Sequence, residues 1–146
     1  MIVYFDTSAL LPLVIEEPGS LIASRLWDDA ERVVSSRLTY AEGRAALAMA
    51  LRMKRIDEQD LRSAVDAFEV VHDQLQLVGV TEALVRRAGV LAEEFALRGY
   101  DSVHLASVEE IADEDVVLAA GDQHLLSAAE ALGIAVADLQ GSPEAE

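Results

Sequence analysis

The residues most able to do chemistry are four acids that stand where an apolar or small-residue stretch ends and a helical pattern begins. They are Asp6, Glu42, Asp101 and Asp122. In an α/β chain the loops at the carboxyl ends of parallel strands share one edge of the sheet, so acids far apart in sequence can converge there. Converged carboxylates raise one another's pKa unless a cation neutralises them. The placement therefore predicts a cation site with oxygen ligands, which suits Mg²⁺ or Mn²⁺.

Taken singly, each acid also has a structural explanation. Asp is a favoured helix N-cap and Glu in a first turn suits the helix dipole. Residues 39–42 fit the capping box Thr-x-x-Glu, in which Glu42 would bond back to a backbone amide, and Asp101 and Asp122 fit simple N-caps. Asp6 is harder to explain in this way, because an acid at the end of a buried strand is costly to desolvate unless it is paired, hydrogen-bonded or metal-bound.

Short apolar runs alternate with helical patterns along the chain. Strands are expected at 2–5, 33–34, 77–80, 116–119 and 134–136, and helices at 8–16, 20–30, 36–55, 57–75, 81–99, 100–112 and 123–132. Thr81 is the expected N-cap of the fifth helix and Gly99 its stop. The alternation predicts an α/β fold whose central, mostly parallel sheet of four to five short strands is flanked by helices.

The chain has 146 residues, of which 52% are hydrophobic, enough for one domain with a buried core. We expect this domain to span 1–139, followed by a flexible tail over 140–146. Cysteine is absent, which excludes disulfides, thiolate metal sites and a cysteine nucleophile. No apolar segment resembles a signal peptide or a membrane span, so the sequence predicts a soluble, cytoplasmic protein.

The charge distribution is uneven. The net charge of −16 argues against binding a polyanion, yet six of the eleven Lys and Arg residues lie between Arg37 and Arg62. An acidic cluster, Glu109-Glu110 with Asp113-Glu114-Asp115, follows later in the chain. This cluster fits either a solvated surface or a docking surface for a basic partner.

Four segments together resemble a known family. They are Ile2-Val3-Tyr4-Phe5-Asp6-Thr7-Ser8-Ala9-Leu10, Thr39-Tyr40-Ala41-Glu42, Arg98-Gly99-Tyr100-Asp101-Ser102-Val103-His104-Leu105-Ala106 and Gly121-Asp122-Gln123-His124-Leu125-Leu126. In this order they resemble a PIN domain, and most of all the VapC-type toxins. The likeness covers nearly the whole chain.

The resemblance implies a Mg²⁺- or Mn²⁺-dependent endoribonuclease in which metal-activated water hydrolyses RNA. It also implies a homodimer and a VapB-type antitoxin with a basic segment that blocks the acidic site. Asp6, Glu42 and Asp101 match the family's principal metal-binding and catalytic acids, and Asp122 matches the fourth. Thr7 or Ser8 is expected to help hold a metal-bound water. The chain departs from the family pattern at Ala120, where Ser or Thr is frequent, and this departure weakens the role of Asp122.

Two other functions remain open from the sequence. A PIN-like adapter that only binds partners fits Ala120 and the acidic surface. A haloacid dehalogenase-like phosphatase would use Asp6 as its nucleophile. That family needs a second acid where Ser8 stands and a lysine near the late strands, whereas the single lysine here is Lys54.

Two further types of residue, histidine and methionine, have more ordinary explanations. His104 lies one helical turn after Asp101, and we expect it to be a packed, hydrogen-bonded histidine rather than a general base. His72 is expected to be structural. Met49 and Met53 have helical spacing and are expected to fill the core or an interface.

Overall fold

The computed structural model describes residues 1–112 and 115–141. The strands are β1 (Ile2–Phe5), β2 (Arg32–Ser36), β3 (Gln76–Val78), β4 (Val116–Ala120) and β5 (Ala135–Asp138). The helices are α1 (Thr7–Leu10), the 3₁₀ helix η1 (Leu11–Leu13), α2 (Ser20–Asp29), α3 (Thr39–Arg52), α4 (Glu58–Gln74), α5 (Glu82–Phe95), α6 (Gly99–Ile111) and α7 (Gln123–Ala131). Residues 142–146 of the predicted tail, and residues 113–114 of the acidic cluster, lie outside the described residues.

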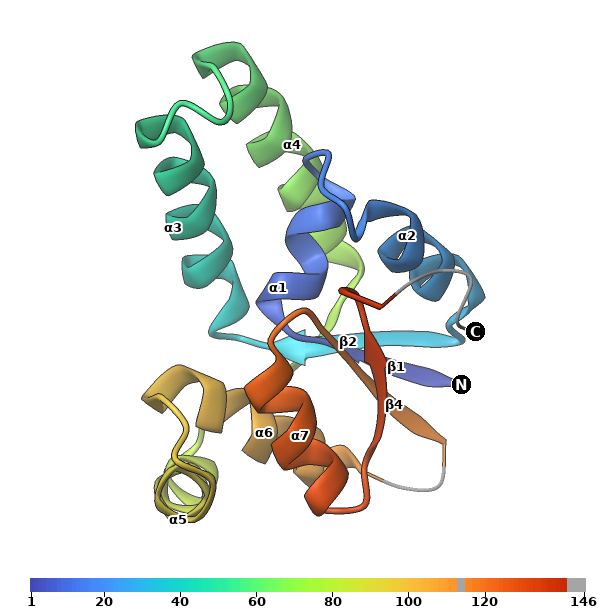
Figure 1. Cartoon of the computed structure of the whole chain (residues 1–146), viewed down its shortest axis with the longest axis vertical. Coiled ribbons are helices and arrows are strands. Elements are labelled where there is room, and N and C mark those ends of the chain that lie inside the picture. Colours follow the sequence, from blue (N-terminus) through green and yellow to red (C-terminus); the bar gives the residue numbers. More distant parts are fainter. Residues whose placement is uncertain (113–114, 142–146) are drawn as a thin grey trace.

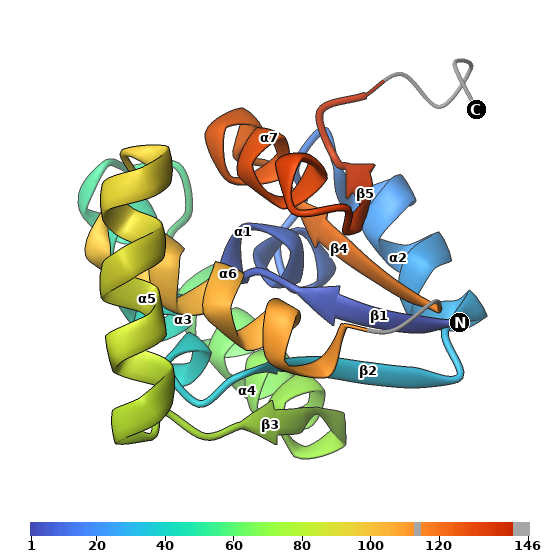
Figure 2. The same cartoon turned by 90° about the horizontal axis from the view of Figure 1, so that it is seen from below.

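All five strands form one sheet in the order β3-β2-β1-β4-β5, and every neighbouring pair is parallel. Figure 2 shows these strands in sheet order from bottom to top. The predicted α/β class and parallel sheet are therefore confirmed. The central strand β1 pairs with both β2 and β4, so its carboxyl end lies in the middle of the sheet edge.

Helices cover both faces of the sheet, α1 to α4 on one and α5 to α7 on the other (Figure 1). The side chains of β1 alternate between the two layers, because successive residues of a strand point to opposite faces. Val3 and Phe5 pack under α1 to α4, and Tyr4 packs under α5 to α7. No helix within the described ranges is long and apolar enough to cross a membrane.

Two predicted helix boundaries were wrong for local reasons. The helix expected over 8–16 is a short α-helix followed by a 3₁₀ turn at Pro12, because proline has no N–H to continue the α-helical hydrogen bonds. The helix expected to stop at Gly99 ends at Phe95, since Ala96 adopts a left-handed backbone with φ of 54°. Gly99 instead begins α6.

The methionine expectation was also wrong in part. Met49 and Met53 on α3 are 52% and 65% exposed, so neither fills the core. The N-cap expected at Thr81 is confirmed, because its side chain accepts a hydrogen bond from the Leu84 N–H at 3.2 Å. His72 packs edge-on against Tyr40, as expected of a structural histidine.

Candidate active site

The four acids meet at the carboxyl edge of the sheet. Asp6 and Asp122 follow the neighbouring strands β1 and β4, while Glu42 and Asp101 lie in the first turns of α3 and α6. In Figure 1 the amino ends of α1 and α3 reach the sheet at this edge. Asp6 and Asp101 are only 6% and 8% exposed. The edge therefore concentrates negative charge that is partly removed from water.

Helix capping explains the positions of Asp6 and Asp122, but not those of Glu42 and Asp101. The Asp6 and Asp122 side chains accept backbone N–H bonds at the starts of α1 and α7. Glu42 does not form the capping box expected from residues 39–42, because α3 already begins at Thr39 and no side chain caps it. Asp101 lies inside the first turn of α6 rather than before it. Tertiary contacts therefore position the Glu42 carboxylate, whereas Asp101 pairs with Arg98, three residues before it.

Glu42 is held by a partly buried hydrogen-bond network. Its Oε1 accepts a bond from Thr7 Oγ1 at 2.8 Å and one from His104 Nε2 at 2.6 Å. On the other side of the imidazole, Nδ1 lies 2.8 Å from the hydroxyl of Tyr4. The Thr7 hydroxyl also contacts Thr39 Oγ1 at 2.7 Å. Side chains of α1 and α6 therefore fix the carboxylate of α3, and His104 is the packed, hydrogen-bonded histidine expected from the sequence.

Ser8 links Asp6 to the loop that follows the neighbouring strand β4. The Ser8 hydroxyl donates to Asp6 Oδ2 at 2.6 Å and accepts the Gly121 N–H at 2.9 Å. This bridge ties the loop after β1 to the loop that carries Asp122. The family resemblance suggests that Thr7 or Ser8 helps to hold a metal-bound water. In the structure both hydroxyls bond to acids of the site.

Arg98 is the residue of the site that sequence reasoning missed. Its Nε donates to Asp101 Oδ2 at 2.9 Å, and its Nη2 lies 3.6 Å from Asp122 Oδ2. The i, i+3 spacing of Arg98 and Asp101 was a usable signal, because residues three apart face one another on a helix. Burial raises the pKa of Asp101, the neighbouring charges of Asp122 and Asp6 raise it further, and Arg98 opposes the change.

His104 has a raised pKa for a different reason. Burial alone would lower its pKa, but the negative charges of Asp6, Glu42 and Asp101, together with the Glu42 hydrogen bond, outweigh burial. Its Nε2 also lies 3.5 Å from Asp6 Oδ1. The imidazole therefore acts as a buried partner for two of the acids.

In metal-free protein we expect the free energy of unfolding to fall as the pH rises above 6.5. Folding raises the pKa of His104, so the folded state holds the proton more tightly. The stabilisation is complete below the unfolded pKa and is lost as the pH rises through the folded pKa. Urea unfolding in EDTA from about pH 6 to 9 measures this pH dependence of the free energy of unfolding. His104→Gln should flatten the profile, whereas His124→Gln, at an exposed position, should not. Parallel profiles for wild type and His104→Gln would contradict this assignment.

The donor chemistry of the edge fits a hard divalent cation. Mg²⁺ and Mn²⁺ prefer carboxylate oxygens, and the buried carboxylates of Asp6 and Asp101 need a positive partner. In the described parts of the chain, however, no three His, Asp or Glu side chains are grouped closely enough to hold one metal ion. Thr7 and His104 hold Glu42, while Arg98 occupies Asp101 and Asp122.

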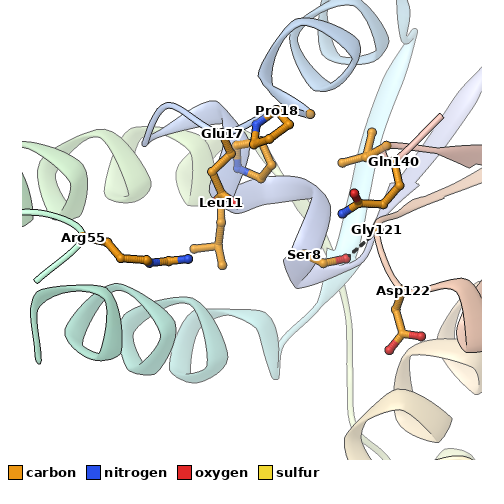
Figure 3. A pocket seen from close by; sticks show the side chains of 11 residues that line it. Ser8, Leu11, Glu17, Pro18, Arg55, Gly121, Asp122 and Gln140 are labelled. Atoms are coloured by element: carbon orange, nitrogen blue, oxygen red, sulfur yellow. Dashed lines mark hydrogen bonds between the residues drawn. The ribbon is translucent and has the colours of Figure 1, made fainter. Parts of the chain in front are cut away.

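A hollow of about 380 Å³ opens beside Asp122, the one of the four acids that lines it. Ser8, Gly121 and Asp122 line one part of it, and Glu17 and Arg55 another. In Figure 3, Arg55 and Asp122 lie on opposite sides of Ser8. Arg55 is the one cation among the described residues that line this hollow, so it is the group there able to pair with a phosphate.

The way α3 ends determines the position of the Arg55 backbone. Lys54 adopts a left-handed backbone with φ of 60°. The N–H groups of Lys54 and Arg55 donate to the carbonyls of Leu51 and Ala50, both at 2.9 Å, which is the Schellman pattern of a helix end. The chain therefore turns sharply after α3 and carries Arg55 to the wall of the hollow.

Comparison with known proteins places this geometry in a family. The family model described as "PIN domain" matches residues 3–139. The chain is 42% identical to Ribonuclease VapC49 of Mycobacterium tuberculosis (strain ATCC 25618 / H37Rv), over 97% of this chain and 99% of that protein. The chain thus belongs to the PIN-domain family, within the group that contains the VapC proteins.

Two solved structures share the fold. VapBC-1 from nontypeable Haemophilus influenzae has a TM-score of 0.65 and 18% identity, covering 97% of this chain and 100% of that chain. A toxin-antitoxin complex from Klebsiella pneumoniae has a TM-score of 0.59 and 16% identity, covering 82% of this chain and 86% of that chain. At these identities the likeness supports the fold alone. The resemblance that the four sequence segments indicated is confirmed at the level of the family.

Proposed function

We propose that this chain is a Mg²⁺- or Mn²⁺-dependent endoribonuclease and the toxin of a toxin–antitoxin pair. The observation that carries the proposal is the convergence of Asp6, Glu42, Asp101 and Asp122 at one edge of the sheet, with Asp6 and Asp101 buried. The 42% identity to a protein named Ribonuclease VapC49 supports RNA as the substrate. The comparisons give no support to the phosphatase alternative, because the family model that matches residues 3–139 is the PIN domain.

The chemistry divides between the cation and the side chains. A bound Mg²⁺ or Mn²⁺ would supply an activated water and neutralise charge on the phosphoryl oxygens. Asp6, Glu42 and Asp101 would hold the ion, with Asp122 as the fourth acid. Thr7 and His104 fix the orientation of Glu42, and Ser8 fixes Asp6 relative to the loop of Asp122. Thr7, Ser8 and His104 are positioning residues in this proposal.

Metal binding separates this function from the adapter alternative. A competent site gains stability when Mn²⁺ is added, by linkage, whereas an adapter without a site does not. Thermal unfolding of the purified chain with Mn²⁺ and with EDTA makes the comparison. An unchanged midpoint over a wide range of Mn²⁺ concentrations would favour the adapter.

We expect Arg55→Ala to weaken RNA binding. Arg55 lines the hollow beside Asp122, and each phosphate contact to a single strand adds about 0.7 to the salt dependence of binding. The variant should therefore raise KM, leave kcat nearly unchanged and lower the salt slope by about 0.7. Arg55→Lys should restore much of the loss. Arg86→Ala, which removes the same charge from the exposed surface of α5, is the control. Equal KM values for Arg55→Ala and Arg86→Ala would exclude this contact.

The proposed partner is a VapB-type antitoxin with a basic segment. The solved toxin-antitoxin complex from Klebsiella pneumoniae shares this fold, and the net charge of −16 suits a basic partner. The predicted acidic cluster is less available than its sequence suggests, since Glu109 already pairs with Arg87 through two hydrogen bonds. A homodimer is proposed on the family resemblance, and light scattering tests it.

Co-expression tests the toxin assignment. The chain expressed alone should arrest growth, and a small neighbouring gene should relieve the arrest. The Asp6→Asn variant should be harmless in the same vector. Normal growth with wild-type protein at a verified expression level would count against a toxin.

A further inference from the structure

Arg98 contacts both acids on the side of the site formed by α6 and α7. It bonds to Asp101 Oδ2 at 2.9 Å and lies 3.6 Å from Asp122 Oδ2. Both carboxylates are less exposed than the guanidinium, with side-chain exposures of 12% and 29% against 67%. Arg98 therefore neutralises two acids of the site while its own charge remains largely in solvent.

The oxygen atoms that Arg98 contacts belong to two of the acids proposed to hold the divalent cation. A carboxylate oxygen that accepts a charge-assisted hydrogen bond has less capacity left for a metal. A cation on Asp101 would also lie close to the guanidinium, and like charges repel. Occupation of Asp101 and Asp122 by a metal ion and by Arg98 is thus mutually unfavourable.

The surroundings of Arg98 allow its guanidinium to move away from Asp101 and Asp122. It stands at the N-cap of α6 with an extended backbone, before the regular helix begins. Its guanidinium carbon also lies 5.3 Å from the ring centre of Tyr100, which offers a cation–π contact at the surface. The guanidinium side chain is 67% exposed, so it can return to water when a divalent cation displaces it.

We propose that Arg98 is a positioning residue that holds Asp101 and Asp122 in the metal-free protein and competes with the divalent cation for them. This inference rests on the proposed metal-dependent function. Metal binding then exchanges one cation for another, and the site is not left with uncompensated charge.

The test compares Mn²⁺ affinity by titration calorimetry in the absence of RNA. Arg98→Gln should lower the dissociation constant by about twofold to fivefold relative to wild type, which corresponds to the loss of one surface ion pair. Arg86→Gln is the matched control, because it removes the same charge from an exposed i, i+4 pair with Glu82. Arg98→Lys, which keeps the charge, should bind Mn²⁺ nearly as wild type does.

The Mn²⁺ affinities of these proteins test the competition and the metal site separately. Tighter Mn²⁺ binding by Arg98→Gln than by Arg86→Gln supports the competition. This holds also if the wild-type protein binds Mn²⁺ too weakly to measure. Equal or weaker binding by Arg98→Gln overturns it, while binding by wild type would leave the proposed metal site standing. Absence of Mn²⁺ binding by wild type and all variants overturns both the competition and the metal-dependent function. Circular dichroism confirms that each variant is folded.

Discussion

Replacing Asp101 by Asn is expected to reduce RNA cleavage by roughly 100-fold or more. Substitutions that only disturb the support of a metal ligand already cost about 10–100-fold, and Asp101 is a proposed ligand itself. Asn keeps the shape of the side chain but removes one anionic oxygen and the negative charge. The measurement is the initial rate of cleavage of a labelled RNA in Mn²⁺.

The fold should survive this substitution. Burial raises the pKa of Asp101, so its ionised form is not favoured by its surroundings alone. Its ion-pair partner Arg98 is mostly exposed, and such a pair contributes about 1 kcal/mol at most. The free energy of unfolding in EDTA should therefore change by no more than about 1 kcal/mol. Glu130→Gln, on the exposed side of α7, is the matched control and should cleave RNA like wild type. Full activity in Asp101→Asn would remove this residue from the site.

Gly43→Ala is expected to destabilise the protein by about 1–3 kcal/mol. Gly43 lies on α3 where α4 packs, and a Cβ atom there would be 2.2 Å from Cζ of Phe68. The Phe68 ring is fully buried and stacks against Tyr40, so it has little room to move. The strain outweighs the gain of about 1 kcal/mol that alanine brings in a helix. Equilibrium urea unfolding should show a lower midpoint.

Gly89→Ala is the control with the opposite expected sign. Gly89 lies within α5, and among the described residues no neighbouring atom would lie within 4 Å of a Cβ atom added there. Alanine should therefore stabilise the protein by about 0.5–1 kcal/mol, because glycine loses more backbone entropy in a helix. If the Gly43→Ala protein were as stable as the Gly89→Ala protein, the described packing of α3 against Phe68 of α4 would be contradicted.

Much of the fold followed from local patterns in the sequence. Each expected strand, such as 2–5 and 116–119, exists within a residue or two, because short β-branched runs between helical patterns have few alternatives. The errors fell where one residue changed the backbone. Pro12 shortened the first helix, and the left-handed backbone of Ala96 ended the fifth helix before Gly99, where the sequence had placed its stop.

The acids of the site were predictable from the sequence, whereas most of the contacts that hold them were not. Asp6, Glu42, Asp101 and Asp122 could be selected because each stands at the start of a helical pattern. The links between them cross long stretches of chain, as from Ser8 to Gly121 or from His104 to Glu42, and no local spacing reveals them. Their roles in metal binding and catalysis remain predictions.

The central claim is that this acidic edge cleaves RNA with a divalent cation. The most direct measurement is cleavage of a labelled RNA by the purified chain in Mn²⁺ and in EDTA, with Asp6→Asn protein prepared in parallel. We predict cleavage only by wild-type protein with Mn²⁺. Equal cleavage in EDTA, or by the Asp6→Asn protein, would contradict the claim.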